Sequence, residues 1–259
     1  MRLAVQLYTL REFTHTEQDF ASALRVCHGI GYEGVQLSAV SCMNGPEPLV
    51  SAARAREMLD ANGLECVATH RQWRSLADSL DTEIQFHQTL RCAYAAVGSI
   101  ESDFGRLPAA YPQFVEQAKP IIERLKSAGI QFGYHNHSHE FMRDPQTGKT
   151  GMDALIELGD PDVMMEIDTY WVLHAGYDPA NMLARLAGRV PMIHVKDREV
   201  AEEGPVMAPV GEGLLDWDRI LPAAQRAGTE WLIVEQDTCR RDPFDCLTSS
   251  FEFLKDRVS

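Results

Sequence analysis

The segment Gln131–Glu140, QFGYHNHSHE, is an apolar run that ends in side chains able to bind a metal ion. Three other runs have the same form: Val163–Asp168 (VMMEID), Val190–Lys196 (VPMIHVK) and Trp231–Glu235 (WLIVE). In a parallel (β/α)₈ barrel all strands point the same way, so the residues at their C-terminal ends converge on one mouth although they are far apart in sequence. The recurrence therefore predicts a barrel whose strand ends share one site.

Short apolar runs alternate with longer amphipathic segments along the chain, which is the βαβα pattern of a parallel sheet covered by helices. Eight strands are expected: Arg2–Leu7, Gly34–Leu37, Glu65–Thr69, Ala93–Val97, Gln131–Asn136, Val163–Ile167, Met192–Val195 and Leu232–Val234. Eight strands favour closure over an open sheet. We therefore expect an α/β protein in which residues 1–259 form a single (β/α)₈ TIM barrel domain.

Helix boundaries are predicted from caps and glycines. Thr16 with Asp19 is typical of a helix start, as is Asp242 followed by Pro243 at the start of the last helix. Pro222 lies inside the seventh helical pattern, so a late start or a kink is expected there. Five glycines end a helical pattern shortly before an apolar run: Gly29, Gly63, Gly129, Gly188 and Gly228.

Two long stretches are expected to be irregular. Ser99–Pro112 is predicted to be a lid or loop after the fourth strand, and Gly204–Trp217 to hang over the barrel mouth after the seventh. Together with Cys42–Pro48 and Arg71–Leu80, these loops would determine substrate specificity.

Composition excludes several classes of protein. The formal net charge is −14 and there is no Lys/Arg block, which disfavours a nucleic-acid partner. Because no apolar stretch approaches about 18 residues and the N-terminus lacks a signal-peptide pattern, we expect a cytoplasmic protein without membrane contacts. The six scattered cysteines are interpreted as free thiols. Oligomeric state is left open, and a homo-oligomer is one possibility.

Asp168, His194 and Glu235 are the first candidate metal ligands. Each has an ordinary structural interpretation, because an Asp there commonly caps the next helix and a lone His in an apolar strand is more often a satisfied core group. A carboxylate buried after WLIV would cost several kcal/mol unless paired, and a cation is one of few suitable partners. Oxygen and nitrogen ligands without cysteine suit Mn²⁺ first, with Mg²⁺, Co²⁺ or Zn²⁺ as alternatives.

The fourth ligand is open between His135, His137 and Glu140. Glu140 is favoured because a third carboxylate suits a hard cation, with His137 or His135 as a nearby acid/base or substrate contact. Lys196 shares the side of His194, where its ammonium could stabilise an oxyanion or form a salt bridge at the barrel rim. The remaining candidates are His139, expected to face solvent, and four residues after strand ends that could contact a sugar ring, Tyr8, His70, Trp73 and Trp171.

The chain resembles the xylose-isomerase-like barrel superfamily of sugar phosphate isomerases and epimerases. The resemblance covers nearly the whole chain and is carried by VQLYTLRE, GYEGVQLS, NGLECVATH, AGIQFGYHNHSHEF, MEIDTYWVLHAGYDP, GRVPMIHVKDR, PVGEGLLDW and WLIVEQD. It implies one divalent ion held by Glu140, Asp168, His194 and Glu235. In many relatives the carboxylate of the fifth strand lies within the strand, at a position that here resembles His135.

The leading functional hypothesis is an isomerase or epimerase that abstracts the proton α to a carbonyl of a sugar, keto-sugar or keto-inositol through a metal-stabilised enediolate. Glu140 and Glu235 are candidates to move the proton, and His137 and Lys196 to position or protonate oxygens. A lyase or dehydratase that shares the first step is the alternative. A metal-dependent phosphodiesterase of the repair-endonuclease type is disfavoured by the acidic charge, and a non-catalytic sugar-binding barrel is a third class.

Overall fold

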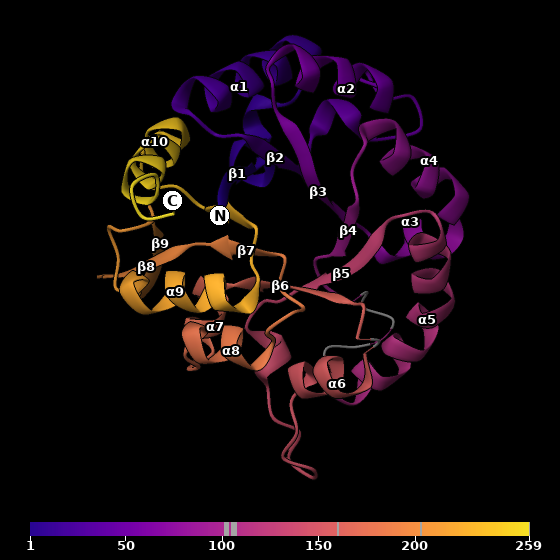
Figure 1. Cartoon of the computed structure of the whole chain (residues 1–259), viewed down its shortest axis with the longest axis vertical. Coiled ribbons are helices and arrows are strands. Elements are labelled where there is room, and N and C mark those ends of the chain that lie inside the picture. Colours follow the sequence, from indigo (N-terminus) through magenta and orange to yellow (C-terminus); the bar gives the residue numbers. More distant parts are fainter. Residues whose placement is uncertain (101–103, 105–107, 160, 203, 259) are drawn as a thin grey trace.

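Eight parallel strands close into a barrel surrounded by helices (Figure 1), in the order β1-β10-β7-β6-β5-β4-β3-β2. This computed structural model describes residues 1–100, 104, 108–159, 161–202 and 204–258. The barrel strands are β1 Arg2–Gln6, β2 Gly34–Leu37, β3 Glu65–Arg71, β4 Tyr94–Val97, β5 Gln131–His135, β6 Met164–Asp168, β7 Met192–Val195 and β10 Trp231–Val234. The predicted fold class is confirmed, and all eight expected strands are present, with ends that shift by at most two residues.

The helices are α1 Glu17–Ile30, α2 Ala52–Ala61, α3 Trp73–Asp78, α4 Leu80–Leu90, α5 Tyr111–Ser127, α6 Gly151–Leu158, α7 Thr169–His174, α8 Pro179–Arg185, α9 Trp217–Ala227 and α10 Pro243–Leu254. Thr16 and Asp19 form a capping box, and Asp242 caps α10 with Pro243 in its first turn, as predicted. The predicted stop at Gly29 is wrong, because α1 continues to Ile30 and ends at Gly31. A late start at Pro222 does not occur either, since α9 runs through it.

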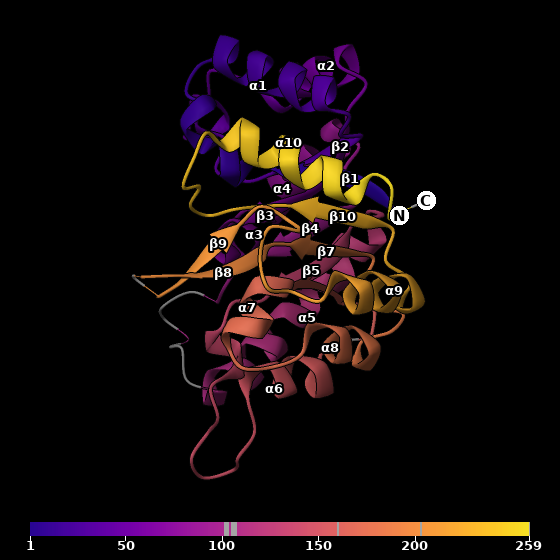
Figure 2. The same ribbon diagram turned by 90° about the vertical axis from the view of Figure 1, so that its left-hand side faces the viewer.

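The stretch after β7 is more regular than expected. β8 (Asp197–Ala201) pairs antiparallel with β9 (Gly204–Ala208), and the two extend beside the barrel (Figure 2). The prediction of an irregular Gly204–Trp217 is therefore wrong for its first five residues. Within the other stretch, Pro108–Ala110 forms a 3-10 turn, while residues 101–103 and 105–107 lie outside the described part of the chain.

Alternation along the strands divides the barrel interior into an apolar and a polar part. Side chains two residues apart share a face of a strand, so Met164, Glu166 and Asp168 all point inward from β6. An apolar layer crosses the N-terminal part of the barrel and includes Ala4, Ala68, Ala96, Met164, Met192 and Ile233. Apart from Gly98, which follows β4 and lies against the His70 ring, the next inward positions are polar: Gln6, Gln36, His70, His135, Glu166, His194 and Glu235. The C-terminal end of the barrel is thus a buried polar chamber.

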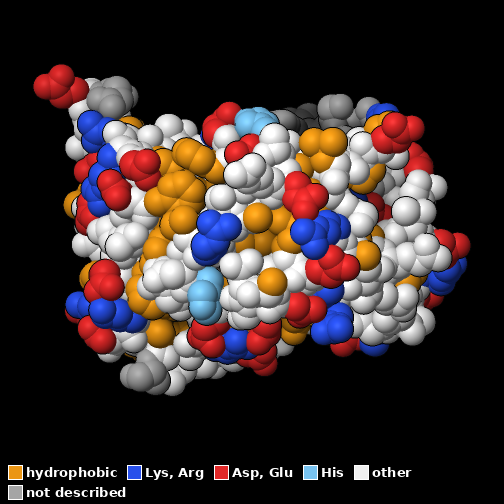
Figure 3. All heavy atoms as spheres, turned by 90° about the horizontal axis from the view of Figure 1, so that it is seen from above, with side chains coloured by type: hydrophobic (Ala, Val, Ile, Leu, Met, Phe, Trp, Pro, Cys, Tyr) orange, Lys and Arg blue, Asp and Glu red, His pale blue; other side chains and the backbone are white. Residues whose placement is uncertain are grey.

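The outer surface carries many exposed ion pairs. Arg54 of α2, for example, contacts both Glu17 and Glu57, and Figure 3 shows acidic and basic side chains interspersed over one face. Among the described residues, no helix has the length and apolar character needed to cross a membrane. All six cysteines are free thiols, as predicted.

One buried carboxylate organises the chain between β9 and α9. Asp197, the first residue of β8, is fully buried. Its oxygens accept hydrogen bonds from the backbone N–H of Arg198, Gly211 and Leu215 and from the indole N–H of Trp217. Because Lys196 precedes Asp197 directly, this anchoring also fixes the end of β7 at the barrel mouth.

We expect Asp197→Ala to lower the free energy of unfolding by about 3 kcal/mol, because four donors lose a buried acceptor. Urea denaturation followed by circular dichroism measures the change. Glu202→Ala, on the exposed hairpin turn, is the control and should change stability by no more than about 0.5 kcal/mol. Equal effects of the two substitutions would show that Asp197 has no anchoring role.

Candidate metal centre

Three of the four predicted ligands meet at the mouth of the barrel. Asp168 ends β6 and His194 lies opposite it on β7 in the strand register. Glu235 follows β10, and all three side chains are buried. His194 Nδ1 lies 2.6 Å from Glu235 Oε2 and 4.0 Å from Asp168 Oδ2. The three ligand atoms are close enough together for one cation to bind them.

Glu140 does not join this group. It accepts hydrogen bonds from the Tyr134 hydroxyl at 2.7 Å and from the His137 backbone N–H at 2.8 Å. Tyr134 belongs to the outward-facing side of β5, so Glu140 lies against the outside of the barrel wall. His135, the next residue along β5, points inward instead, and its Nε2 lies 3.9 Å from Asp168 Oδ2. Of the fifth-strand candidates, the structure therefore brings His135 to the cluster.

Lys196 is buried in the same chamber and bridges its carboxylates. Its Nζ lies 2.9 Å from Asp168 Oδ2, 2.8 Å from Glu235 Oε2 and 3.1 Å from Asp237 Oδ1. Asp168 also has the structural role considered above, because its Oδ1 accepts the N–H of Trp171 at the start of α7. Asp168 Oδ1 therefore caps helix α7, while Asp168 Oδ2 faces the chamber.

The electrostatics of the chamber show an excess of negative charge. Burial raises the pKa of Asp168 to about 6, against the opposing effect of Lys196 and His194. Burial alone would lower the pKa of His194, but Glu166 and Glu235 outweigh it and raise this pKa to about 10. Burial is likewise outweighed at Glu235, where Lys196 and His194 hold the pKa well below its usual value.

A divalent cation fits this set of donors. Four carboxylates gather around one ammonium and one imidazolium: Glu166, Asp168, Glu235 and Asp237 around Lys196 and His194. Among the described residues, Asp168 Oδ2 accepts no aligned hydrogen bond, although it is fully buried. A divalent cation that replaced the proton of His194 would reduce the excess of negative charge and use this oxygen. Nitrogen and oxygen donors of this kind suit Mn²⁺, Co²⁺ or Zn²⁺.

Glu166 is a site residue that the sequence analysis missed. It lies one inward position before Asp168 on β6, and its Oε2 lies 2.5 Å from His70 Nε2 and 3.3 Å from both His135 Nδ1 and His194 Nε2. Gln36 of β2 donates to its other oxygen at 2.7 Å. The signal that could have found Glu166 was the two-residue spacing from Asp168 in MMEID.

The other predicted contact residues differ in their placement. His70 lies inside the chamber, with its ring stacked on His194 at a centroid distance of 5.3 Å. His137 lies 5.4 Å from the Trp171 ring at the mouth, and burial lowers its pKa to about 4, so the imidazole is neutral near pH 7. Tyr8 lies just after β1, with the Arg11 guanidinium 4.4 Å from its ring centroid.

Two further sequence interpretations need correction. His139 was expected to face solvent, but it is half-buried, with its Nε2 2.8 Å from Glu140 Oε1. Trp73 does not face the mouth. It is buried in the core, where it packs edge-on against Phe104 and Phe114.

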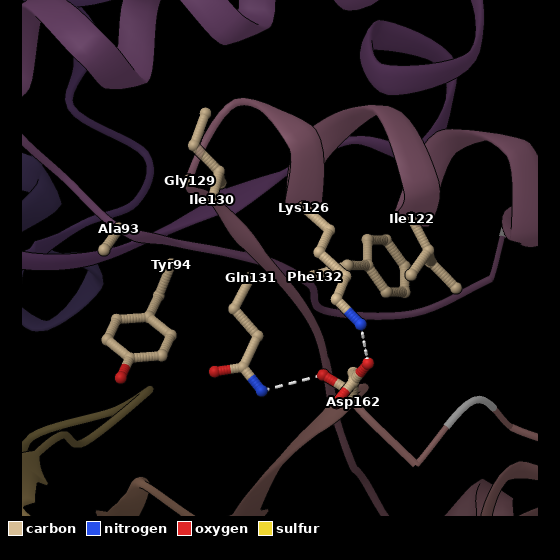
Figure 4. A pocket seen from close by; sticks show the side chains of 9 residues that line it. All are labelled: Ala93, Tyr94, Ile122, Lys126, Gly129, Ile130, Gln131, Phe132 and Asp162. Carbon is tan, nitrogen blue, oxygen red and sulfur yellow. Dashed lines mark hydrogen bonds and ion pairs between the residues drawn. The ribbon is translucent and has the colours of Figure 1, made fainter.

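A separate surface cleft of about 380 Å³ lies near the opposite end of the barrel (Figure 4). It is lined by residues at the N-terminal ends of β4 and β5, including Tyr94 and Gln131, and by an ion pair between Lys126 and Asp162. This cleft brings together no set of carboxylates and imidazoles like that in the chamber. The chemistry of the molecule is therefore concentrated at the C-terminal mouth, as in other barrels of this type.

Comparison with known proteins agrees with this architecture. A family model described as "Xylose isomerase-like TIM barrel" matches residues 24–257. The chain belongs to this family. A sugar phosphate isomerase/epimerase from Parabacteroides distasonis superposes with a TM-score of 0.81 at 22% identity, over 99% of this chain and 94% of that one. The structure titled "IOLI protein with a binding zinc atom" superposes with a TM-score of 0.67 at 15% identity, over 100% and 98% of the two chains.

Curated relatives match only part of the chain. An inosose dehydratase from Lacticaseibacillus casei is 29% identical over 152 residues, which are 51% of this chain and 49% of that protein. An inosose dehydratase from Geobacillus kaustophilus is 24% identical over 204 residues, which are 66% and 65% of the two chains. The matches thus span about half to two thirds of the length of these relatives.

We expect Lys196→Met to lower the free energy of unfolding by about 3–5 kcal/mol in the presence of a chelator, because Asp168 and Glu235 lose their buried cation. Added Mn²⁺ should then stabilise the variant more than the wild type, since the metal no longer shares these oxygens with an ammonium. Thermal unfolding with and without Mn²⁺ measures both effects. Lys149→Met, which removes an exposed ion pair with Glu157, is the control. A variant as stable as the wild type in chelator would contradict the bridging role.

Proposed function

We propose that this protein is a divalent-cation-dependent isomerase or epimerase that removes the proton α to the carbonyl of a keto-sugar or keto-inositol. The observation that carries the proposal is the buried cluster of Asp168, His194 and Glu235 with Lys196, in which carboxylates outnumber cations. Two structures similar to this chain are described as sugar phosphate isomerase/epimerases, which supports this reaction class.

The proposed ligands are His135, Asp168, His194 and Glu235, so that His135 replaces Glu140 as the residue from the fifth strand. Its inward direction and its distance of 3.9 Å from Asp168 Oδ2 support this choice. Mn²⁺ is the first candidate, because a mixture of carboxylates and imidazoles suits it better than Mg²⁺, which prefers oxygen ligands. Co²⁺ and Zn²⁺ are the alternatives.

When bound, the cation supplies a Lewis acid that polarises the substrate carbonyl. Glu235 is the proposed proton acceptor, since it lies at the mouth and its carboxylate is ionised. Lys196 lies 2.8 Å from Glu235 Oε2, so its ammonium is placed to donate to a substrate oxygen that gains negative charge next to this base.

His137 and Trp171 at the mouth would contact hydroxyl groups of the substrate, because the His137 Nδ1 and Trp171 Nε1 atoms are buried without a hydrogen-bond partner among the described residues. An unphosphorylated carbohydrate or polyol is the proposed substrate, because no Gly-rich anion cradle accompanies the site.

A dehydratase is the second candidate. It is favoured by the similarity to two inosose dehydratases, which covers half to two thirds of the chain. Both reactions begin with loss of the α-proton. They diverge afterwards, because an isomerase or epimerase returns a proton to carbon whereas a dehydratase expels the β-hydroxyl group.

Metal affinity tests the ligand from the fifth strand. We expect His135→Ala to weaken Mn²⁺ binding by at least about 100-fold, because one of four ligands is lost, and Glu140→Gln to weaken it by less than about threefold. Competition with a chelating dye gives both constants. The reverse order of the two effects would restore Glu140 as the ligand and reject His135.

The α-proton step is tested by incubating the Mn²⁺-loaded protein with ketoses and keto-inositols in D₂O and following deuterium incorporation by NMR. We expect exchange that Glu235→Gln slows by at least about 100-fold, because the base is lost. Glu212→Gln, which changes a surface pair with Arg241, is the matched control. A product lighter by one water identifies the dehydratase. Exchange that survives both a chelator and Glu235→Gln would refute the proposed mechanism.

A further inference from the structure

Glu166 lies at the floor of the chamber, where it is fully buried and surrounded by donors from four strands. Its Oε2 lies 2.5 Å from His70 Nε2, 3.3 Å from His135 Nδ1 and 3.3 Å from His194 Nε2. Its Oε1 accepts a hydrogen bond of 2.7 Å from Gln36 Nε2. Three imidazoles therefore turn one ring nitrogen each toward a single carboxylate; the His70 contact is an aligned hydrogen bond, whereas His135 Nδ1 has no aligned partner among the described residues.

We propose that Glu166 is a positioning residue that fixes the tautomers of the two histidine ligands, so that their lone pairs point at the cation. This inference rests on the proposed metal centre and extends it to the residue beneath. An ionised carboxylate can only accept hydrogen bonds, so a ring nitrogen that faces it carries a proton unless a cation takes the place of that proton, as proposed for His194 Nδ1 beside Glu235. In a neutral imidazole the opposite nitrogen then carries the lone pair.

The opposite nitrogens lie where the ligands are needed. His194 Nδ1 faces Glu235 Oε2 at 2.6 Å and Asp168 Oδ2 at 4.0 Å. His135 Nε2 faces Asp168 Oδ2 at 3.9 Å. Histidines that bind a metal commonly donate their other N–H to a carboxylate, which fixes the ring and raises its basicity as a ligand. Here Glu166 Oε2 lies 3.3 Å from a nitrogen of each of the two proposed ligand rings.

Gln36 gives an independent indication of the same tautomer at His194. Its Nε2 donates to Glu166, so its Oε1 is the atom 2.7 Å from His194 Nε2. An amide oxygen can only accept, so both neighbours of His194 Nε2 require a proton on that nitrogen. Glu166 and Gln36 thus impose the same tautomer on His194.

Glu166 also belongs, with His70, His135 and His194, to a group whose ligand atoms lie close enough together to hold a cation, but its present contacts favour the positioning role. Both of its oxygens already accept hydrogen bonds, from Gln36 and His70. Asp168 provides the contrast, because its Oδ2 accepts no aligned hydrogen bond among the described residues. Asp168 Oδ2, which contacts the Lys196 ammonium at 2.9 Å, lies in the upper layer of the chamber, and the Glu166 carboxylate lies in the floor.

The test compares the wild type with Glu166→Gln, which keeps the size of the side chain and removes its charge. Zn²⁺ affinity is measured by chelator competition, and the ring nitrogens of ¹⁵N-histidine are assigned by NMR in the Zn²⁺-loaded protein. We expect one equivalent of Zn²⁺, His194 protonated on Nε2 and His135 on Nδ1. Glu166→Gln should weaken binding by about 10- to 100-fold and alter both imidazole N–H resonances, and Glu166→Asp should recover part of the affinity.

Glu83→Gln is the matched control, because Glu83 is also a buried carboxylate but pairs with Arg71 outside the chamber. It should affect stability without changing Zn²⁺ affinity. Unchanged affinity and unchanged N–H resonances in Glu166→Gln would overturn the positioning role alone. A second equivalent of Zn²⁺ that disappears in this variant would also overturn it, since Glu166 would then be a ligand. A wild type that binds no Zn²⁺ would overturn the metal centre itself. If Glu166→Gln does not fold, Zn²⁺ affinity and the imidazole N–H resonances are compared between the wild type and the variants Glu166→Asp and Gln36→Leu instead.

Discussion

Ionised carboxylates inside a closed barrel are the constraint on which this structure depends. Each of them would cost several kcal/mol if it were buried without partners. Glu166 is compensated by His70, Gln36 and the rings above it, and Asp168 and Glu235 are compensated by Lys196. These groups form one connected network, so removal of any member leaves another buried charge or donor without its partner.

The register of the barrel strands, and not the loops, brings most residues of this network together. Asp168 stands opposite His194 across β6 and β7, and His135 stands opposite Glu166 across β5 and β6. Because side chains two residues apart share a face, Glu166 and Asp168 form successive layers on one strand. The positions of the proposed ligands are thus set by strand hydrogen bonds, and strands are more rigid than the loops that would select a substrate.

The sequence predicted what depends on local pattern and missed what depends on tertiary placement. The eight strands follow from apolar runs and turns, and the caps at Thr16 and Asp242 follow from local hydrogen bonding. Glu166 was overlooked because both faces of the strand MMEID are buried, so the sequence does not alternate between apolar and polar residues and does not show which side chains point inward. Glu140 was misplaced because the direction of the turn after β5 is decided by the outward-facing Tyr134. The β8–β9 hairpin was read as irregular because its pairing holds little apolar alternation.

The identity of residue 135 and that of Glu166 depend on each other. A carboxylate in place of His135 would lie close to Glu166, where two negative charges in a buried site repel and one is forced to take up a proton. An imidazole offers Glu166 an N–H and still presents a nitrogen toward Asp168. The resemblance noted in the sequence implies that many relatives have a carboxylate at this position of the fifth strand. In this chain Glu166 places a negative charge one layer deeper and on the neighbouring strand β6, and the side chain of residue 135 that faces Asp168 is an imidazole.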